Sequence, residues 1–281
     1  MITGKTKLIG LLGYPVGHSF SPAIHNAAFA ALELDYIYVP LSVEPDNLGQ
    51  AVAGLKAMGF VGANVTIPHK VNIMPYLDEL DWSADMVGAV NTIVIRKGRC
   101  IGYNTDVQGF VQSLIAKNIN IKGKNAVIMG AGGAARAVVC GLIEHGIDQI
   151  IIGTRSNPKA QGFVKLFPGA TNIHGCDWQE KMFTDAVTQC DILINCTPIG
   201  MASSPKIQLP INWSNVKSTA VVCDLIYNPS LTEFLIHAQD EGHEIINGAA
   251  MLVEQGALAF ELWTGENAPR NIMSATLAQF I

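Results

Sequence analysis

Short apolar runs alternate along the chain with segments in which apolar residues recur at helical spacing. Before residue 105 the predicted order is strand, helix, strand, helix, strand, over residues 7–12, 21–31, 36–41, 46–58 and 60–65. This β-α-β-α-β order predicts a small, mostly parallel sheet. The apolar residues of 88–96 predict one more strand, which turns at Lys97 and Gly98 into a hairpin that ends at Tyr103.

The second half of the chain predicts a separate parallel sheet. Its predicted strands cover residues 125–129, 150–154, 191–195, 220–224 and 244–246. The helical patterns of 248–263 and 269–280 have no strands of their own, so we expect this tail to pack on the first sheet. The chain is therefore predicted to be an α/β protein with two domains around a cleft. One domain comprises residues 1–105 and 248–281, and the other comprises residues 106–247.

A glycine-rich turn joins the strand over 125–129 to the helix that follows it. Gly130, Gly132 and Ala135 occupy the small positions of a G-x-G-x-x-A pattern. Small residues here let the main chain turn sharply and approach a pyrophosphate, which then faces the free N–H groups of a helix N-terminus. Glycines alone also serve ordinary turns, but the strand before this turn and the helix after it favour nucleotide binding. Residues 106–247 are therefore predicted to form a Rossmann-like dinucleotide-binding domain, and residues 1–105 and 248–281 the substrate-binding domain.

The end of the next predicted strand indicates which nucleotide binds. An NAD site usually carries Asp or Glu here for the ribose 2′-hydroxyl, and this chain has neither. Arg155 and Lys159 instead offer positive charge to a 2′-phosphate, with Thr154 and Ser156 as hydroxyl donors. The cofactor is therefore predicted to be NADP, against the alternative of a solvated basic turn.

Composition narrows the function classes. The chain has 281 residues, 49% of them hydrophobic, a formal net charge of −5 and a sequence pI of about 5.8. It has no run of basic residues and no stretch near the roughly 18 apolar residues of a membrane span, so we expect no nucleic-acid or membrane partner. Six cysteines without C-x-x-C spacing predict reduced thiols, no metal site and a cytoplasmic protein. The oligomeric state is not readable from the sequence, which leaves a homodimer open.

Polar side chains with candidate chemistry follow the third predicted strand. Asn64, Thr66 and Lys70 lie where ligands of parallel sheets bind. Asp106 begins a helix further along, and N-capping is the plainer explanation for an isolated Asp at such a position. His69 is a neighbour of Lys70, so we expect it to point away from the side that Lys70 faces.

Two hydroxyls gather at the first predicted helix. Ser21 is the expected N-cap, with Pro22 at the first helical position, and Ser19 lies two residues earlier. Hydroxyls at a helix N-terminus can bind a carboxylate through neutral donors. Simple capping is the alternative.

Taken in their order along the chain, these segments and several others resemble the shikimate dehydrogenase family. The matching segments are Gly13–Pro22, Asn64–Lys70, Gly88–Thr92, Gly102–Asp106, the glycine-rich turn, Asp224–Pro229 and Asn247–Gln255. The resemblance implies a cytoplasmic, NADP-dependent oxidoreductase of the shikimate pathway, and so of chorismate and aromatic amino acid biosynthesis. Its reaction is the reversible reduction of 3-dehydroshikimate to shikimate by NADPH.

The resemblance also implies a role for each matching residue. Lys70 and Asp106 match the catalytic pair. Contacts to the substrate carboxylate match Ser19, Ser21 and Tyr227, and contacts to the ring hydroxyls match Asn64, Thr66, Asn91 and Gln255. The nucleotide contacts match Gly130, Ala131, Gly132, Gly133 and Ala134 in the turn, Thr154, Arg155, Ser156 and Lys159 around the 2′-phosphate, and Met201, Leu225, Gly248 and Met251 on the nicotinamide side.

The chemistry of the residues agrees with these roles. Oxidation of an alcohol needs a group that removes the hydroxyl proton, while the nicotinamide accepts the hydride. Lys is a poor base at its ordinary pKa of about 10.4, but a desolvated Lys can serve, and a neighbouring Asp can orient it.

Two alternatives remain open at this point. The family's nucleotide signature usually begins Asn-Arg-Thr, whereas this chain has Thr154, Arg155 and Ser156, and quinate differs from shikimate by one hydroxyl near the carboxylate. A quinate/shikimate dehydrogenase with relaxed use of NAD and NADP is therefore the first alternative. The second is a module that senses shikimate without converting it, although Lys70 and Asp106 are both present.

Overall fold

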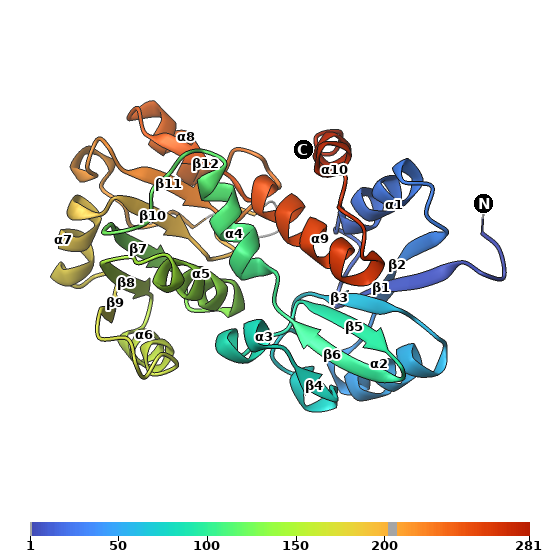
Figure 1. Ribbon diagram of the computed structural model, residues 1–281. Coiled ribbons are helices and arrows are strands. Elements are labelled where there is room, and N and C mark those ends of the chain that lie inside the picture. The colour runs from blue at the N-terminus through green and yellow to red at the C-terminus, as the bar shows by residue number, and fades with distance from the viewer. Residues whose placement is uncertain (1, 202–206) are drawn as a thin grey trace. The chain divides into compact units, whose positions relative to one another are not determined.

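The computed structural model describes residues 2–201 and 207–281 and divides the chain into two compact units. The first unit runs to Gly109 and includes Val253–Phe280, and the second unit is formed by Phe110–Leu252. The divisions fall within helix α4 (Asp106–Ile115) and helix α9 (Gly248–Thr264). Figure 1 shows each unit as a sheet with its own helices.

The sheet of the first unit has six strands in the order β2-β1-β3-β5-β6-β4. The strands are β1 (Lys7–Gly13), β2 (Tyr36–Ser42), β3 (Gly62–Val65), β4 (Glu79–Leu80), β5 (Thr92–Arg96) and β6 (Arg99–Tyr103). β1 pairs in parallel with β2 and β3, while β5 pairs antiparallel with β3 and β6. The predicted parallel core and the predicted hairpin through Lys97 and Gly98 are both confirmed, in a sheet that is mixed as a whole.

Four further helices belong to the first unit: α1 (Ser21–Ala31), α2 (Leu48–Ala57), α3 (Trp82–Val87) and α10 (Arg270–Leu277). Helix α10 packs on α1, and residues 253–280 of the tail belong to the first unit, whereas residues 248–252 at the start of α9 belong to the second. The prediction that Ser21 caps α1 is wrong. Phe20 holds the N-cap position without a side-chain hydrogen bond, and Ser21 is the first helical residue.

The sheet of the second unit is parallel throughout, in the order β12-β11-β10-β7-β8-β9. The strands are β7 (Asn125–Met129), β8 (Gln149–Thr154), β9 (Ile173–Asp177), β10 (Ile192–Asn195), β11 (Val221–Asp224) and β12 (Glu244–Ile246). Its other helices are α5 (Gly133–Glu144), α6 (Asn157–Val164), α7 (Lys181–Gln189) and α8 (Glu233–Asp240). Five of these strands were predicted. β9 was not, because His174, Gly175 and Asp177 interrupt its apolar pattern.

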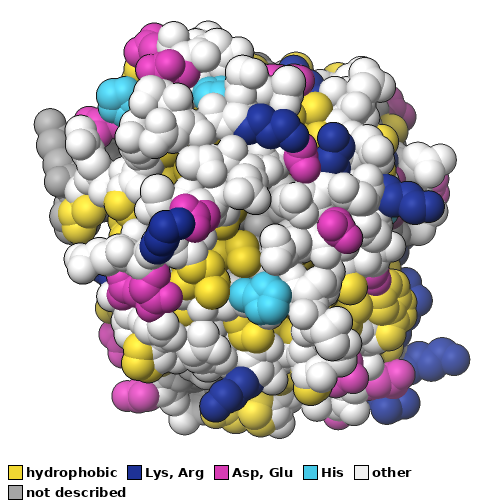
Figure 2. All heavy atoms as spheres, turned by 90° about the vertical axis from the view of Figure 1, so that its left-hand side faces the viewer, with side chains coloured by type: hydrophobic (Ala, Val, Ile, Leu, Met, Phe, Trp, Pro, Cys, Tyr) yellow, Lys and Arg dark blue, Asp and Glu magenta, His cyan; other side chains and the backbone are white. Residues whose placement is uncertain are grey.

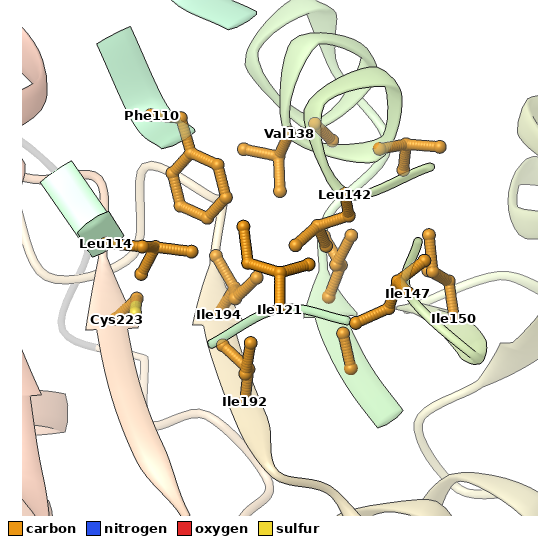
Figure 3. Close-up of a cluster of buried hydrophobic side chains, with 14 of the residues drawn as sticks. Phe110, Leu114, Ile121, Val138, Leu142, Ile147, Ile150, Ile192, Ile194 and Cys223 are labelled. Carbon is orange, nitrogen blue, oxygen red and sulfur yellow. The ribbon is translucent and has the colours of Figure 1, made fainter. Parts of the chain in front are cut away.

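Alternate strand residues of this sheet face two separate cores, as the twofold period of a strand requires. Ile128 and Ile194 face the core that α4 and α5 cover, whereas Val127 and Leu193 face the core covered by α7 and α8. Figure 3 shows part of the first core, where Val138 and Leu142 of α5 point toward the isoleucines of the sheet. This packing fixes the strand ends from which the turns after β7 and β8 emerge.

Neither sign of charge predominates on the face of the molecule drawn in Figure 2. On the face drawn there, basic and acidic side chains are interspersed in small groups. This distribution agrees with the modest net charge of −5. Within residues 2–201 and 207–281, none of the helices has the length and apolar character needed to cross a membrane.

Candidate active site

Lys70 and Asp106 form a half-buried ion pair in the first unit. Lys70 lies in the turns that follow β3, and Asp106 is the first residue of α4. Lys70 Nζ lies 2.6 Å from Asp106 Oδ2, and their side chains are 23% and 7% exposed. The separation is that of a charge-assisted hydrogen bond. The Asp106 side chain is therefore engaged with Lys70, which is not the arrangement of the N-cap considered from the sequence.

Asn91 holds the other oxygen of this carboxylate. Its Nδ2 atom donates to Asp106 Oδ1 at 2.8 Å and to Thr105 Oγ1 at 2.9 Å. Its Oδ1 atom accepts hydrogen bonds from the Thr105 N–H and the Thr92 hydroxyl. Asn91 is 2% exposed, so its amide is committed to the protein on both polar ends. The structure places it under the Lys70–Asp106 pair.

Asn64, on β3, lies beside Asn91 in the same buried network. Its Nδ2 atom donates to the Asn91 carbonyl at 3.1 Å and to Thr92 Oγ1 at 3.0 Å. Its Oδ1 atom accepts from the Tyr38 hydroxyl at 2.8 Å. Gln255, on α9, approaches Asn91 with its side chain, and its carbonyl accepts from the Thr105 hydroxyl. The structure therefore brings Asn64, Asn91, Asp106 and Gln255 together in one hydrogen-bonded group.

Three hydroxyl side chains lie at strand and helix ends of this unit. Ser19 Oγ accepts a hydrogen bond from the main-chain N–H of Ser21, and both residues are partly exposed at the start of α1. Thr66 follows β3 and is also partly exposed. His69, in contrast, is fully buried, and its Nε2 atom bonds the Val43 carbonyl at 2.7 Å. The expectation that His69 points away from Lys70's side is consistent with this burial.

The glycine-rich turn of the second unit has the shape that a dinucleotide needs. Gly130 has φ +108, a left-handed conformation in which a side chain would be strained. Gly132 is the N-cap of α5, and a Cβ atom at Gly132 or Gly133 would meet nothing within 4 Å. Ala131 and Ala134 are partly exposed beside them. Open space in front of a helix N-terminus is where a pyrophosphate fits, so the residues present match the group.

The turn after β8 carries both exposed and buried polar side chains. Arg155 and Lys159 are exposed, and neither forms an ion pair with any residue that the structure describes. Ser156 is also exposed, and its main-chain N–H and carbonyl both bond the hydroxyl of Thr154. Thr154 is 3% exposed, so its hydroxyl shapes the turn from within. The two free cations suit a 2′-phosphate, and the carboxylate expected of an NAD site is absent from this strand end.

Three of the four residues assigned to the nicotinamide side, Leu225, Gly248 and Met251, lie at or beside the start of α9. A Cβ atom on Gly248 would lie 2.1 Å from the Leu225 carbonyl oxygen, so only glycine allows this approach. Leu225 and Met251 pack in one cluster, to which Ala131 of the glycine-rich turn also belongs. Met201 is exposed in the loop after β10. Tyr227 is partly buried in the loop after β11, and burial raises the pKa of its hydroxyl.

Asp224 anchors these loops from below. It is 1% exposed at the end of β11, and burial raises the pKa of its carboxyl to about 6, against hydrogen bonds from Thr232, the Ile226 N–H and Asn195 that favour the charged form. Asn195 Nδ2 donates to Asp224 Oδ1 and to the Ile199 carbonyl, at 3.1 Å each. One amide therefore ties the loop after β10 to the loop after β11.

Three residues of the first network carried no signal that singled them out in the sequence. Tyr38 reads as a core aromatic of β2, and Thr92 as an ordinary residue of β5. Thr105 stands beside Asp106, and this adjacency is the one clue to its position between Asn91 and α9. Hydroxyls that bond within a unit are found by three-dimensional placement rather than by spacing.

Comparisons with known proteins match nearly the whole chain. Residues 11–93 match the family described as "Shikimate dehydrogenase substrate binding domain", residues 113–209 match "Shikimate / quinate 5-dehydrogenase", and residues 248–278 match "Shikimate 5'-dehydrogenase C-terminal domain". A curated relative from Desulforamulus reducens, named "Shikimate dehydrogenase (NADP(+))", is 46% identical over 281 residues and is covered at 96%, with 98% of this chain.

Solved structures of similar proteins share the fold as well. A crystal structure of a shikimate dehydrogenase in complex with NADP+ is 43% identical, with a TM-score of 0.92 over 99% of this chain and 97% of that chain. A quinate dehydrogenase from Corynebacterium glutamicum in complex with NAD is 30% identical, with a TM-score of 0.90 over 98% and 99%. The two TM-scores are nearly equal, whereas this chain is 43% identical to the shikimate dehydrogenase and 30% identical to the quinate dehydrogenase. Sequence identity therefore distinguishes these two relatives, and the fold does not.

Proposed function

Because the chain belongs to the shikimate dehydrogenase family, which reduces 3-dehydroshikimate to shikimate with NADPH, we propose that Lys70 and Asp106 carry out the proton transfer of this reaction. The observation that supports this role is the 2.6 Å contact between Lys70 Nζ and a carboxylate that is 7% exposed. A buried carboxylate fixes the direction of a flexible lysine side chain, which lets Lys70 present one N–H bond to a substrate oxygen.

The proton moves between Lys70 and the oxygen at C3. NADPH, when bound, supplies the hydride that reduces the C3 carbonyl carbon. The Lys70 ammonium gives its proton to the carbonyl oxygen, which becomes the C3 hydroxyl, and the amine regains a proton from water, to which its side chain is 23% exposed. In the reverse direction the neutral amine takes the hydroxyl proton. Asp106 holds Lys70 in place through both directions.

Most of the proposed substrate contacts come from residues of the first unit. Ser19 and Ser21 bind the carboxylate of shikimate through hydroxyl and main-chain donors at the start of α1. Tyr227 keeps the role of a carboxylate contact that the family resemblance implies. Thr66 and Gln255 contact ring hydroxyls, and so does Asn64 through the free lone pair of Oδ1. Asn91, whose amide is already committed, supports the site by holding Asp106. The first unit is thus the substrate domain of this proposal.

The second unit holds NADP in this proposal. Gly130, Ala131, Gly132, Gly133 and Ala134 face the pyrophosphate at the N-terminus of α5. Arg155, Lys159 and Ser156 bind the 2′-phosphate, while Thr154 keeps the turn in shape from inside. Met201, Leu225, Gly248 and Met251 line the nicotinamide side. Reduced thiols support a cytoplasmic location, since the cysteines at 100, 140, 176, 190, 196 and 223 are all free.

Initial rates of NADPH formation or oxidation test the function and its nearest alternative together. We expect high activity with shikimate and NADP and lower activity with quinate. With NAD we expect at least tenfold lower kcat/KM, because a charged contact to the 2′-phosphate is worth roughly 1.5–3 kcal/mol. Equal rates with quinate or NAD would move the chain to the relaxed quinate/shikimate dehydrogenases. No turnover with any of the four combinations would favour a module that senses shikimate.

Lys70→Met tests the proton-transfer role directly. We expect kcat to fall by roughly 10²-fold or more, as loss of a general acid/base does. Lys56→Met is the matched control, because Lys56 forms a 2.9 Å ion pair with Asp78 in the same unit at 35% and 37% side-chain exposure. Its kcat should equal that of the unmodified protein. A Lys70→Met protein with unchanged kcat would remove Lys70 from the mechanism.

A further inference from the structure

A continuous row of buried hydrogen bonds runs from the start of α1 to the Lys70–Asp106 pair. Its members are Ser21, Tyr38, Asn64, Thr92, Asn91 and Asp106. The links between Tyr38 and Asp106 measure 2.8, 3.0, 2.9 and 2.8 Å in that order. Ser21 bonds the Tyr38 hydroxyl at the far end. From Tyr38 to Asp106 no member is more than 6% exposed.

The direction of every hydrogen bond in this row follows from its end groups. Asn91 Nδ2 must face Asp106, because an ionised carboxylate only accepts, and Asn91 Oδ1 then faces the Thr105 N–H and the Thr92 hydroxyl. Thr92 gives its single proton to Asn91, so it accepts from Asn64.

The same reasoning fixes the other half of the row. The Asn64 amide must turn Nδ2 toward the Asn91 carbonyl, which can only accept, and its Oδ1 therefore accepts from Tyr38. Tyr38 has one proton, already given to Asn64, so the Ser21 hydroxyl donates to Tyr38. All donors consequently point toward the Asp106 carboxylate.

We propose that Thr92 and Tyr38 are positioning residues, which polarise this one-way row of hydrogen bonds and thereby hold the Asp106 carboxylate in its orientation against Lys70. Hydrogen bonds that run in one direction strengthen one another, and their summed polarity favours a negative charge at the accepting end. The inference rests on the proposed role of Lys70 and Asp106. Ser21 belongs to the proposed carboxylate site, so the row also joins the two ends of the substrate site.

Thr92→Val interrupts the row at its centre with a side chain of the same shape. We expect kcat for shikimate oxidation to fall about fivefold, the effect of one net hydrogen bond of about 1 kcal/mol, while KM for NADP stays unchanged. Thr92→Ser keeps the hydroxyl and should restore most of kcat. Thr264→Val is the matched control, because Thr264 donates to the Phe260 carbonyl in the same unit, outside the row.

A double-mutant comparison separates the proposed role from simple packing. Tyr38→Phe keeps the ring that stacks on His25 and removes only the hydroxyl, and we expect a smaller loss of kcat because Tyr38 lies further from Asp106. Once Thr92→Val has cut the row, adding Tyr38→Phe should cause almost no further loss. Losses that multiply would show two independent structural effects and would overturn the proposal.

Two results keep this test distinct from that of the proposed function. If Lys70→Met leaves kcat unchanged, the proton-transfer role itself fails. If Lys70→Met lowers kcat but Thr92→Val does not, the role stands and the positioning row is refuted. Each variant is also assayed with shikimate deuterated at C3, because slower chemistry preserves or raises the isotope effect. A loss of kcat without an isotope effect in Thr92→Val would overturn the proposal as well.

Discussion

Asp224→Asn should remove the part of the pH dependence of the unfolding free energy that comes from titration of the Asp224 carboxyl. The pKa of the Asp224 carboxyl rises from 3.8 to about 6 on burial, so the folded protein binds this proton more tightly than the unfolded chain does. The contribution to the free energy of unfolding is present below about pH 4 and is lost as pH rises through about 6. At 1.36 kcal/mol per pKa unit, the full loss is about 3 kcal/mol.

The amide should fit the same site. Asp224 Oδ1 accepts from Asn195 and from the Ile226 N–H, and Oδ2 accepts from the Thr232 hydroxyl. An asparagine can keep its oxygen toward the first two and turn its nitrogen toward Thr232, whose oxygen can accept. Because asparagine does not ionise, the variant should gain about 2 kcal/mol relative to the unmodified protein between about pH 4.5 and pH 7.5.

Urea unfolding at several pH values measures this difference. Tryptophan fluorescence reports on the right unit, because Trp178 and Trp213 both pack against the core of the second unit that includes Val222 of β11. Asp191→Asn is the control, because its expected change in unfolding free energy has the opposite sign. Burial disfavours the Asp191 charge, but hydrogen bonds from Lys217 and the Asn125 N–H, together with Lys124, lower its pKa overall. That variant should lose stability near neutral pH. A pH-independent difference for Asp224→Asn would refute the reasoning.

Two more substitutions test the nucleotide unit. Arg155→Gln should raise KM for NADP about tenfold or more, with little change in KM for shikimate. Lys165→Gln, just past the other end of α6, is the control and should change neither KM. An unaltered KM for NADP in Arg155→Gln would exclude Arg155 as a 2′-phosphate ligand. Gly248→Ala should lower the unfolding free energy by about 1–3 kcal/mol, because its Cβ would meet the Leu225 carbonyl at 2.1 Å. Gly54→Ala, with 3.6 Å to the nearest atom, should be neutral or stabilising, and an equal loss in both variants would refute the steric argument.

The fold could be predicted from the sequence where an element buries a long apolar surface. The strands of the second sheet were found because each is a run of apolar residues between turns, with β9 as the exception. β4 and α3 escaped prediction because they have only two and six residues, too few to show a period. The N-cap of α1 was misplaced by one residue, since Ser21 and Pro22 fit either frame.

Sequence reasoning reached Lys70 and Asp106 by motif, but their partners required coordinates. Asp106 alone suggested a helix cap, and its contact with Lys70 depends on the turns after β3 that bring the two residues together. Tyr38 and Thr92 lie 26 and 28 positions from Asn64, a separation for which neither helix nor strand periodicity gives a signal. Their hydroxyls belong to the site through sheet pairing, not through spacing.

Each unit has a buried carboxylate, at or just after the end of a strand, that accepts a hydrogen bond from an asparagine amide. Comparison of the two predicts which carboxylate can be replaced. Asn91 donates to Asp106 in the first unit, and Asn195 donates to Asp224 in the second. Asp106 also contacts the Lys70 cation, whereas Asp224 has no ion-pair partner within residues 2–201 and 207–281. The Asp106 charge is needed to hold its partner Lys70 in place, whereas the Asp224 charge, which has no cation beside it, opposes folding.

Asp106→Asn should therefore abolish most of kcat, while Asp224→Asn should keep kcat and gain stability near neutral pH. Equal losses of kcat in the two variants would show that Asp224 acts through its charge on the loops that it anchors.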